Sequence, residues 1–173
     1  MINIVKYAIF LIFLILLQVS VLSHIDFMGY INPYLYIYFI LVLPLQLPRL
    51  HMLIIGFVLG LSMDMMLNTP GLHTIPTVLV AYIRGYVAQK SMMRGELEGI
   101  DSPMVFTMGL SAFLVYSGTL VMIHHSLLFL LDSFRWQRIF SSLLNALYSS
   151  LMTMVLILII QYVFVSRKKV RMY

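Results

Sequence analysis

The chain has 173 residues, of which 62% are hydrophobic and only 10% are charged. This composition is too apolar for a soluble domain of that length and predicts a polytopic membrane protein. The net charge of +5 does not indicate nucleic-acid binding, because the basic residues lie between and after apolar runs and not on one polar surface. The absence of cysteine excludes thiol nucleophiles, disulfides and thiolate metal sites.

Apolar segments follow one another along the chain, each near the length of about 20 residues that a helix needs to cross the hydrocarbon core. We place them at residues 5–22, 33–47, 52–67, 71–88, 104–123 and 139–165. The connecting loops are too short to build a core of their own. The sequence therefore predicts one all-α domain over residues 1–173, a polytopic membrane helix bundle of about six transmembrane helices.

The basic residues predict how these helices are oriented. With the N-terminus inside, eight Lys and Arg side chains fall on the inside and two, Arg135 and Arg138, fall outside. Both termini are therefore expected in the cytoplasm. Arg84 lies toward the cytoplasmic end of the fourth segment, where we expect its side chain to extend to the lipid headgroups.

The third segment carries two glycines and a carboxylate at four-residue spacing, Gly56, Gly60 and Asp64. At this spacing the three residues share one face of a helix. The glycine pair lets a second helix approach closely, either another helix of this chain or that of a partner. A charged carboxylate such as Asp64 is costly in free energy at membrane depth unless other groups of the protein bind it. Asp64 is therefore expected either to be a structural carboxylate bonded to neighbouring helix ends or to line a polar cavity.

The sixth segment begins with polar residues at the depth predicted for Asp64. Ser142 and Asn145 belong to this group, which could line an outward-facing polar pocket together with Asp64. Hydrogen bonding between helices is the equally open alternative.

The second segment carries a stripe of tyrosines at helical spacing, Tyr30, Tyr34 and Tyr38. The outer members suit the aromatic belt of a membrane protein. The stripe could also pack on another protein.

Four histidines fall on predicted outer loops or outer helix ends: His24, His73, His124 and His125. They lack the i, i+4 spacing with an accompanying carboxylate that marks a zinc helix, so we predict no metal site. The sequence has no phosphate-binding loop, no H-E-x-x-H and no Ser-x-x-Lys motif. We therefore expect neither enzymatic activity nor a cofactor.

Several of these features together resemble the MreD family of rod shape-determining proteins, over almost the whole chain. The shared features, in chain order, are Asn32-Pro33, an aromatic-rich segment, Leu47-Pro48-Arg49, the Gly-Phe-x-x-Gly-Leu-x-x-Asp block at residues 56–64, Phe140-Ser141-Ser142-x-x-Asn145 and a basic C-terminus. The resemblance implies a fold like the substrate-binding S-components of energy-coupling-factor transporters. It also implies a non-enzymatic multi-pass subunit of the bacterial cell-elongation complex in the cytoplasmic (inner) membrane.

Such a subunit binds the single-span protein MreC and works with MreB, RodA and a class B penicillin-binding protein to place lateral peptidoglycan synthesis and maintain cell shape. We expect the MreC helix to pack on Gly56 and Gly60, with the tyrosine stripe as the second choice. The alternative function is a small-molecule-binding subunit like an S-component, with a ligand near Asp64 and Asn145. The first segment favours the scaffold, because Ala8 is its only alanine and it lacks the Ala-x-x-x-Ala docking surface typical of S-components.

Overall fold

The computed structural model describes residues 4–24, 31–92, 100–133 and 139–164, and these residues form an all-helical bundle. The long helices are α1 (Ile4–Ser20), α3 (Arg49–Leu67), α4 (Thr74–Ser91), α6 (Leu110–Ser133) and α7 (Ile139–Phe164). The short elements are the 3₁₀ turn η1 (Leu22–His24), α2 (Ile37–Val42) and α5 (Val105–Met108).

Four helical stretches in the described part of the chain are long and apolar enough to cross a membrane. They are α1 with η1, α3, α6 and α7. Their outward faces carry large aliphatic and aromatic side chains, which suit contact with lipid. The prediction of an all-α membrane protein is confirmed at this level.

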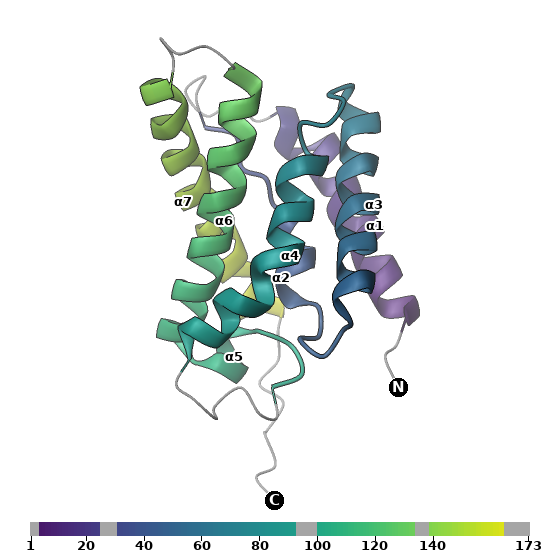
Figure 1. The fold of residues 1–173 in the computed structure, drawn as a ribbon, viewed down its shortest axis with the longest axis vertical. Coiled ribbons are helices and arrows are strands. Elements are labelled where there is room, and N and C mark those ends of the chain that lie inside the picture. The colour runs from purple at the N-terminus through teal and green to yellow at the C-terminus, as the bar shows by residue number, and fades with distance from the viewer. Residues whose placement is uncertain (1–3, 25–30, 93–99, 134–138, 165–173) are drawn as a thin grey trace, which may run out of the picture.

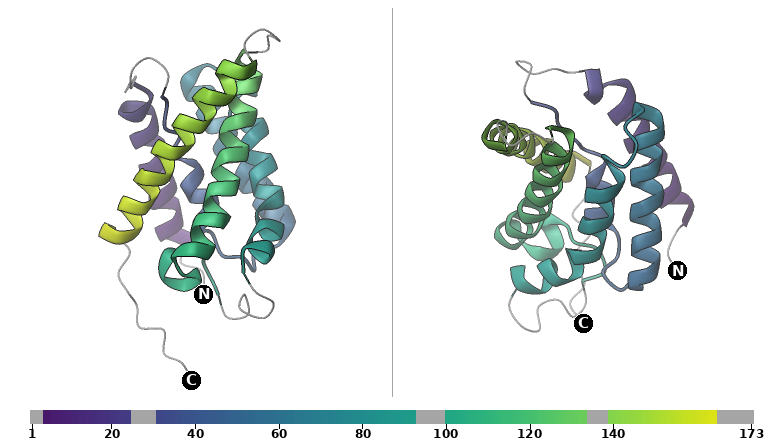
Figure 2. Two further views of the ribbon diagram at one scale, coloured as in Figure 1. Left: turned by 90° about the vertical axis from the view of Figure 1, so that its left-hand side faces the viewer. Right: turned by 45° about the horizontal axis from the view of Figure 1, so that its top comes forward.

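The long helices form a curved row around α2 (Figures 1 and 2). Along this row α3 packs on α4, α4 on α6 and α6 on α7, while α1 contacts α3 and α2. The described chain begins and ends at the end of the bundle where α3 starts, which we call the Arg49 end (Figure 1). The opposite end, where α3 passes into α4, is the Asp64 end.

The second predicted helix is the largest correction to the sequence analysis. Residues 32–34 are not helical, and only Ile37–Val42 form a helix. Leu43 leaves the helix with φ −60° and ψ 150°, the extended conformation favoured before a proline such as Pro44. All six residues of α2 are nevertheless buried, so this broken segment is the centre of the bundle and not a peripheral span.

Polar side chains from the surrounding helices bind the backbone groups that the broken segment leaves free. Gln18 of α1 donates to the Pro33 carbonyl at 3.0 Å and accepts from the Leu35 N–H at 2.7 Å. From α7, Ser149 accepts from the N–H of Asn32. Thr153 (α7) likewise accepts from Tyr34, while Tyr116 (α6) and Arg84 (α4) donate to carbonyls at the end of α2. Non-helical backbone at membrane depth is tolerated only where the protein satisfies it in this way.

Replacing Gln18 with leucine is therefore expected to destabilise the bundle. The substitution keeps a side chain of similar size but leaves one buried N–H and one buried C=O without a partner, at about 1–3 kcal/mol each. Thermal unfolding of the purified protein in detergent measures this loss as a lower Tm. Gln89→Leu is the matched control, because Gln89 is exposed on α4; an equal loss there would assign the effect to the leucine itself.

The fifth predicted segment, residues 104–123, is displaced in the structure. Its first residues form the separate α5, and α6 then continues ten residues beyond the predicted end, to Ser133. The prediction stopped at the polar pair His124 and His125, which we expected outside the helices. Both residues instead belong to α6, and their side chains are buried in the bundle.

Candidate functional site

Asp64 lies in the last turn of α3, and its carboxylate binds the start of α4. One oxygen, Oδ1, accepts from the His73 N–H at 2.8 Å and from the Thr69 hydroxyl at 3.2 Å. The other oxygen, Oδ2, accepts from the N–H groups of Gly71 and Thr74, both at 3.0 Å, and from the Thr74 hydroxyl at 2.5 Å. The first N–H groups of a helix have no partner inside that helix, so the carboxylate both satisfies these donors and meets the positive end of the helix dipole. Of the two predicted roles, the structure shows the structural one.

The turn between α3 and α4 is shaped to bring these donors to Asp64. Asn68 ends α3 in the left-handed conformation at φ 56°, and Gly71 has φ 84°. The N–H of Thr69 also donates to the Asp64 carbonyl at 3.0 Å. Asparagine and glycine adopt positive φ at the least cost, which explains these residue types in the turn.

The glycine face of α3 is occupied by α4. A Cβ atom at Gly60 would lie 2.5 Å from the Cα of Thr74, and one at Gly56 would lie 2.8 Å from the Cβ of Ala81. Both glycines are buried, so the close approach that the spacing predicts is made within the chain. A partner helix cannot use this groove while α4 fills it, which corrects our first choice for the MreC surface.

The tyrosine stripe does not form a partner face either. Tyr38 is buried and its hydroxyl accepts a hydrogen bond from Gln161 at 2.8 Å. Tyr34 belongs to the non-helical stretch and packs edge-on against the His73 ring and at a tilt against the His125 ring, at centroid distances of 5.3 and 5.4 Å. Helical spacing predicted one shared face, but this part of the segment is not a helix, and Tyr30 lies outside the described residues.

A cluster of buried rings lies beside the broken segment, toward the Asp64 end. The Tyr36 hydroxyl is 3.0 Å from Nδ1 of His73 and 2.8 Å from Nε2 of His124. His125 contacts the Thr153 hydroxyl at 3.0 Å. Among the described residues, no group of three or more His, Asp or Glu side chains has the arrangement of a metal site.

The described residues do not bring Asp64 together with the start of the sixth segment. Asp64 lies on the α3 side of the bundle, whereas Ser142 and Asn145 belong to α7 at the other end of the helix row (Figure 1). The Ser142 hydroxyl contacts that of Ser133 on α6. Asn145 is half-buried on the same helix. The Ser133–Ser142 contact joins α6 and α7, as the alternative prediction of hydrogen bonding between helices expects.

Arg84 is the residue whose position the sequence analysis missed most clearly. Its side chain is buried and bonded within the bundle, not extended over the outer surface as expected. The guanidinium donates to the carbonyl of Ile40 at 2.8 Å, to that of Leu43, and to the Met52 sulfur at 3.3 Å. The signal in the sequence was Pro44, since a helix that ends before a proline at membrane depth leaves carbonyls that need a donor.

The carboxylate and most of the buried hydrogen-bonding side chains described above thus bind the chain's own backbone. Within the described residues, one buried side-chain nitrogen, His124 Nδ1, has no hydrogen-bond partner. This arrangement holds a broken membrane segment in place, and it leaves outward surfaces for contacts with lipid or another helix. No protein-family model matches the sequence, and neither a curated protein nor a solved structure matches it.

Proposed function

We propose that the chain is a non-enzymatic membrane subunit of the bacterial cell-elongation complex, similar to MreD. In this role it crosses the cytoplasmic membrane about six times with both termini inside. It binds MreC and acts with MreB, RodA and a class B penicillin-binding protein in lateral peptidoglycan synthesis. The observation that carries the proposal is that the block at residues 56–64 holds α4 against α3. The resemblance to MreD depends on this block.

The contacts of that block support a role in helix packing. Gly56 and Gly60 admit α4, and Asp64 binds the first N–H groups of that helix. A scaffold needs a rigid bundle and an outer surface, whereas the S-component alternative needs a ligand site at Asp64 and Asn145. The carboxylate that the S-component alternative would use is already bonded to five donors of the chain. The geometry therefore favours the scaffold.

The surface left for the MreC helix is the outer face of α1. This helix is the least buried of the four apolar spans. Its exposed large apolar side chains are Val5, Ile9, Ile12, Phe13 and Leu16. Helices associate in lipid through close side-chain packing, and a single-span partner of similar length can lie along this face.

The double variant Ile9→Ala, Phe13→Ala is expected to weaken recovery of MreC with the tagged chain about tenfold, which corresponds to about 1.4 kcal/mol of lost contact. Both side chains are more than half exposed, at 63% and 55%, so the fold loses little. The matched control is Val155→Ala, Ile159→Ala on α7, where the exposed fractions are 51% and 50%. Equal recovery of MreC from both double variants would remove α1 from the interface.

A further inference from the structure

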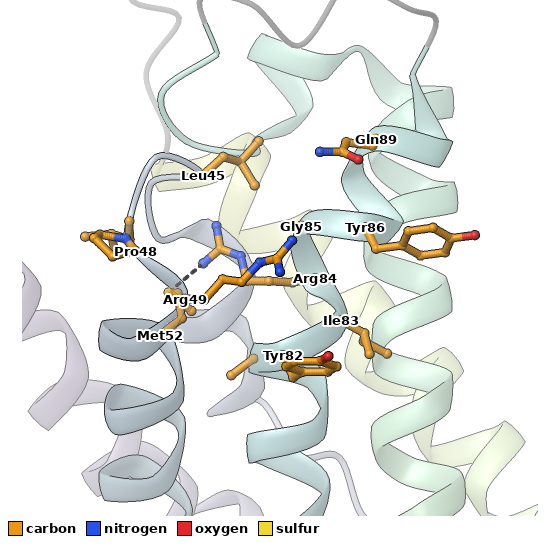
Figure 3. Close-up of a pocket in the computed structure, with 12 residues that line it drawn as sticks. Leu45, Pro48, Arg49, Met52, Tyr82, Ile83, Arg84, Gly85, Tyr86 and Gln89 are labelled. Carbon is orange, nitrogen blue, oxygen red and sulfur yellow. Dashed lines mark hydrogen bonds between the residues drawn. The ribbon is translucent and has the colours of Figure 1, made fainter.

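A cavity of about 600 Å³ opens at the Arg49 end, outside the buried ring cluster and the Asp64 contacts (Figure 3). It lies between the connection before α3, the first turn of α3 and the last turns of α4. Its lining includes Leu45, Pro48, Arg49, Met52, Arg84 and Gly85. A volume of this size accommodates a small molecule or a lipid headgroup.

The wall of the cavity holds a fixed positive charge. Arg84 is 3% exposed, and its guanidinium contacts two carbonyls, a thioether and the Tyr116 hydroxyl, which are neutral groups. These contacts fix the position of the guanidinium but do not cancel its charge. A buried charge without an opposite charge is costly, so a bound anion would be stabilised here.

A second guanidinium reaches the same cavity from the opposite side. Arg49 is the first residue of α3, and Figure 3 shows its side chain extending from α3 toward α4 near Arg84 and Gly85. None of the described residues that line the cavity is acidic. Two arginines that share a cavity are suited to phosphate, which guanidinium groups bind through paired N–H donors.

The depth of the cavity in the membrane indicates which kind of molecule carries such a phosphate. The cavity lies at the end of α3, a helix long and apolar enough to span the membrane, and therefore at the depth of the headgroups. Two more residues of its lining, Tyr82 and Tyr86, are exposed on α4, as is typical of the aromatic belt at a membrane interface. We propose that this cavity binds the phosphate of an anionic phospholipid, held by Arg49 and Arg84.

Binding of phosphatidylglycerol to the purified full chain, measured by native mass spectrometry in detergent, tests this proposal. We expect one bound lipid on the wild type and at least about tenfold weaker binding to Arg49→Gln, because Arg49 is exposed and its loss leaves the bundle intact. Gly85→Phe provides an independent block. A Cβ at Gly85 meets no atom within 4 Å, so the ring can enter the cavity without disturbing the fold.

Lys6→Gln is the matched control, since it removes one exposed positive charge from α1 at the same end of the bundle. We expect this variant to bind as the wild type does. Equal binding of phosphatidylglycerol to the wild type and to Arg49→Gln would overturn the proposal. An equal loss of lipid binding in Lys6→Gln and Arg49→Gln would also overturn it, because it would show only general attraction of the lipid to basic residues. Phosphatidylcholine bound as tightly, or release of the lipid by millimolar inorganic phosphate, would also contradict an anionic lipid site.

Discussion

Gly60→Ala is expected to destabilise the bundle strongly, although alanine is the better helix former. The added Cβ would lie 2.5 Å from the Cα of Thr74, 3.0 Å from its nitrogen and 3.1 Å from the His73 carbonyl oxygen. All three are backbone atoms, so relief requires α4 to move away from α3. Overpacking of this kind typically costs about 1–3 kcal/mol. Movement of α4 would also pull its first N–H groups away from Asp64.

Thermal unfolding in detergent measures the effect, and Gly85→Ala and Gly118→Ala are the matched controls. Nothing lies within 4 Å of a Cβ at either control position. Alanine is favoured over glycine in a helix by about 1 kcal/mol, so these controls should hold or raise the Tm. A wild-type Tm for Gly60→Ala would show that α4 does not pack on this glycine.

Asp64→Ala is also expected to destabilise the bundle strongly. It removes the acceptor for the N–H groups of Gly71, His73 and Thr74 and for the hydroxyls of Thr69 and Thr74. Each buried donor left unpaired costs about 1–3 kcal/mol, and the start of α4 loses a favourable negative charge. We expect loss of the folded protein or a Tm lowered by more than in any other variant described above. Asp64→Asn should be intermediate, because its amide keeps one acceptor oxygen.

Yield of monodisperse protein and thermal unfolding together measure these effects. Asp132→Asn is the matched control, since Asp132 is exposed near the end of α6. A normal yield and Tm for Asp64→Ala would contradict the role of this carboxylate in holding α4. The same result would reopen the possibility that Asp64 serves a ligand.

The α3–α4 pair could be predicted from the sequence in its main features. Small residues at four-residue spacing predict close helix packing, and the alternative that Asp64 binds neighbouring helix ends is the one found. Which helix fills the groove could not be predicted, because spacing carries no information about the partner. The left-handed Asn68 and the Gly71 turn identify that helix only once the structure is known.

The broken segment could not be predicted because hydropathy does not distinguish a buried extended chain from a membrane helix. Residues 33–43 are apolar in either conformation. The sequence features that indicate the break are prolines. Pro33 lies at the start of the segment, and Pro44 and Pro48 lie within five residues of each other at its end. The same limit explains Arg84, His124 and His125. Their polarity predicted positions at the headgroups or at outer loops and helix ends, but partners from other helices make their burial possible.

The measurement that tests the proposed function most directly is affinity purification of the tagged chain from the cells that naturally make it, with mass spectrometry of bound proteins and small molecules. The scaffold proposal predicts recovery of MreC together with RodA and a class B penicillin-binding protein, and loss of MreC with Ile9→Ala, Phe13→Ala. Recovery of a stoichiometric small molecule with transporter subunits, and of no MreC, would contradict it.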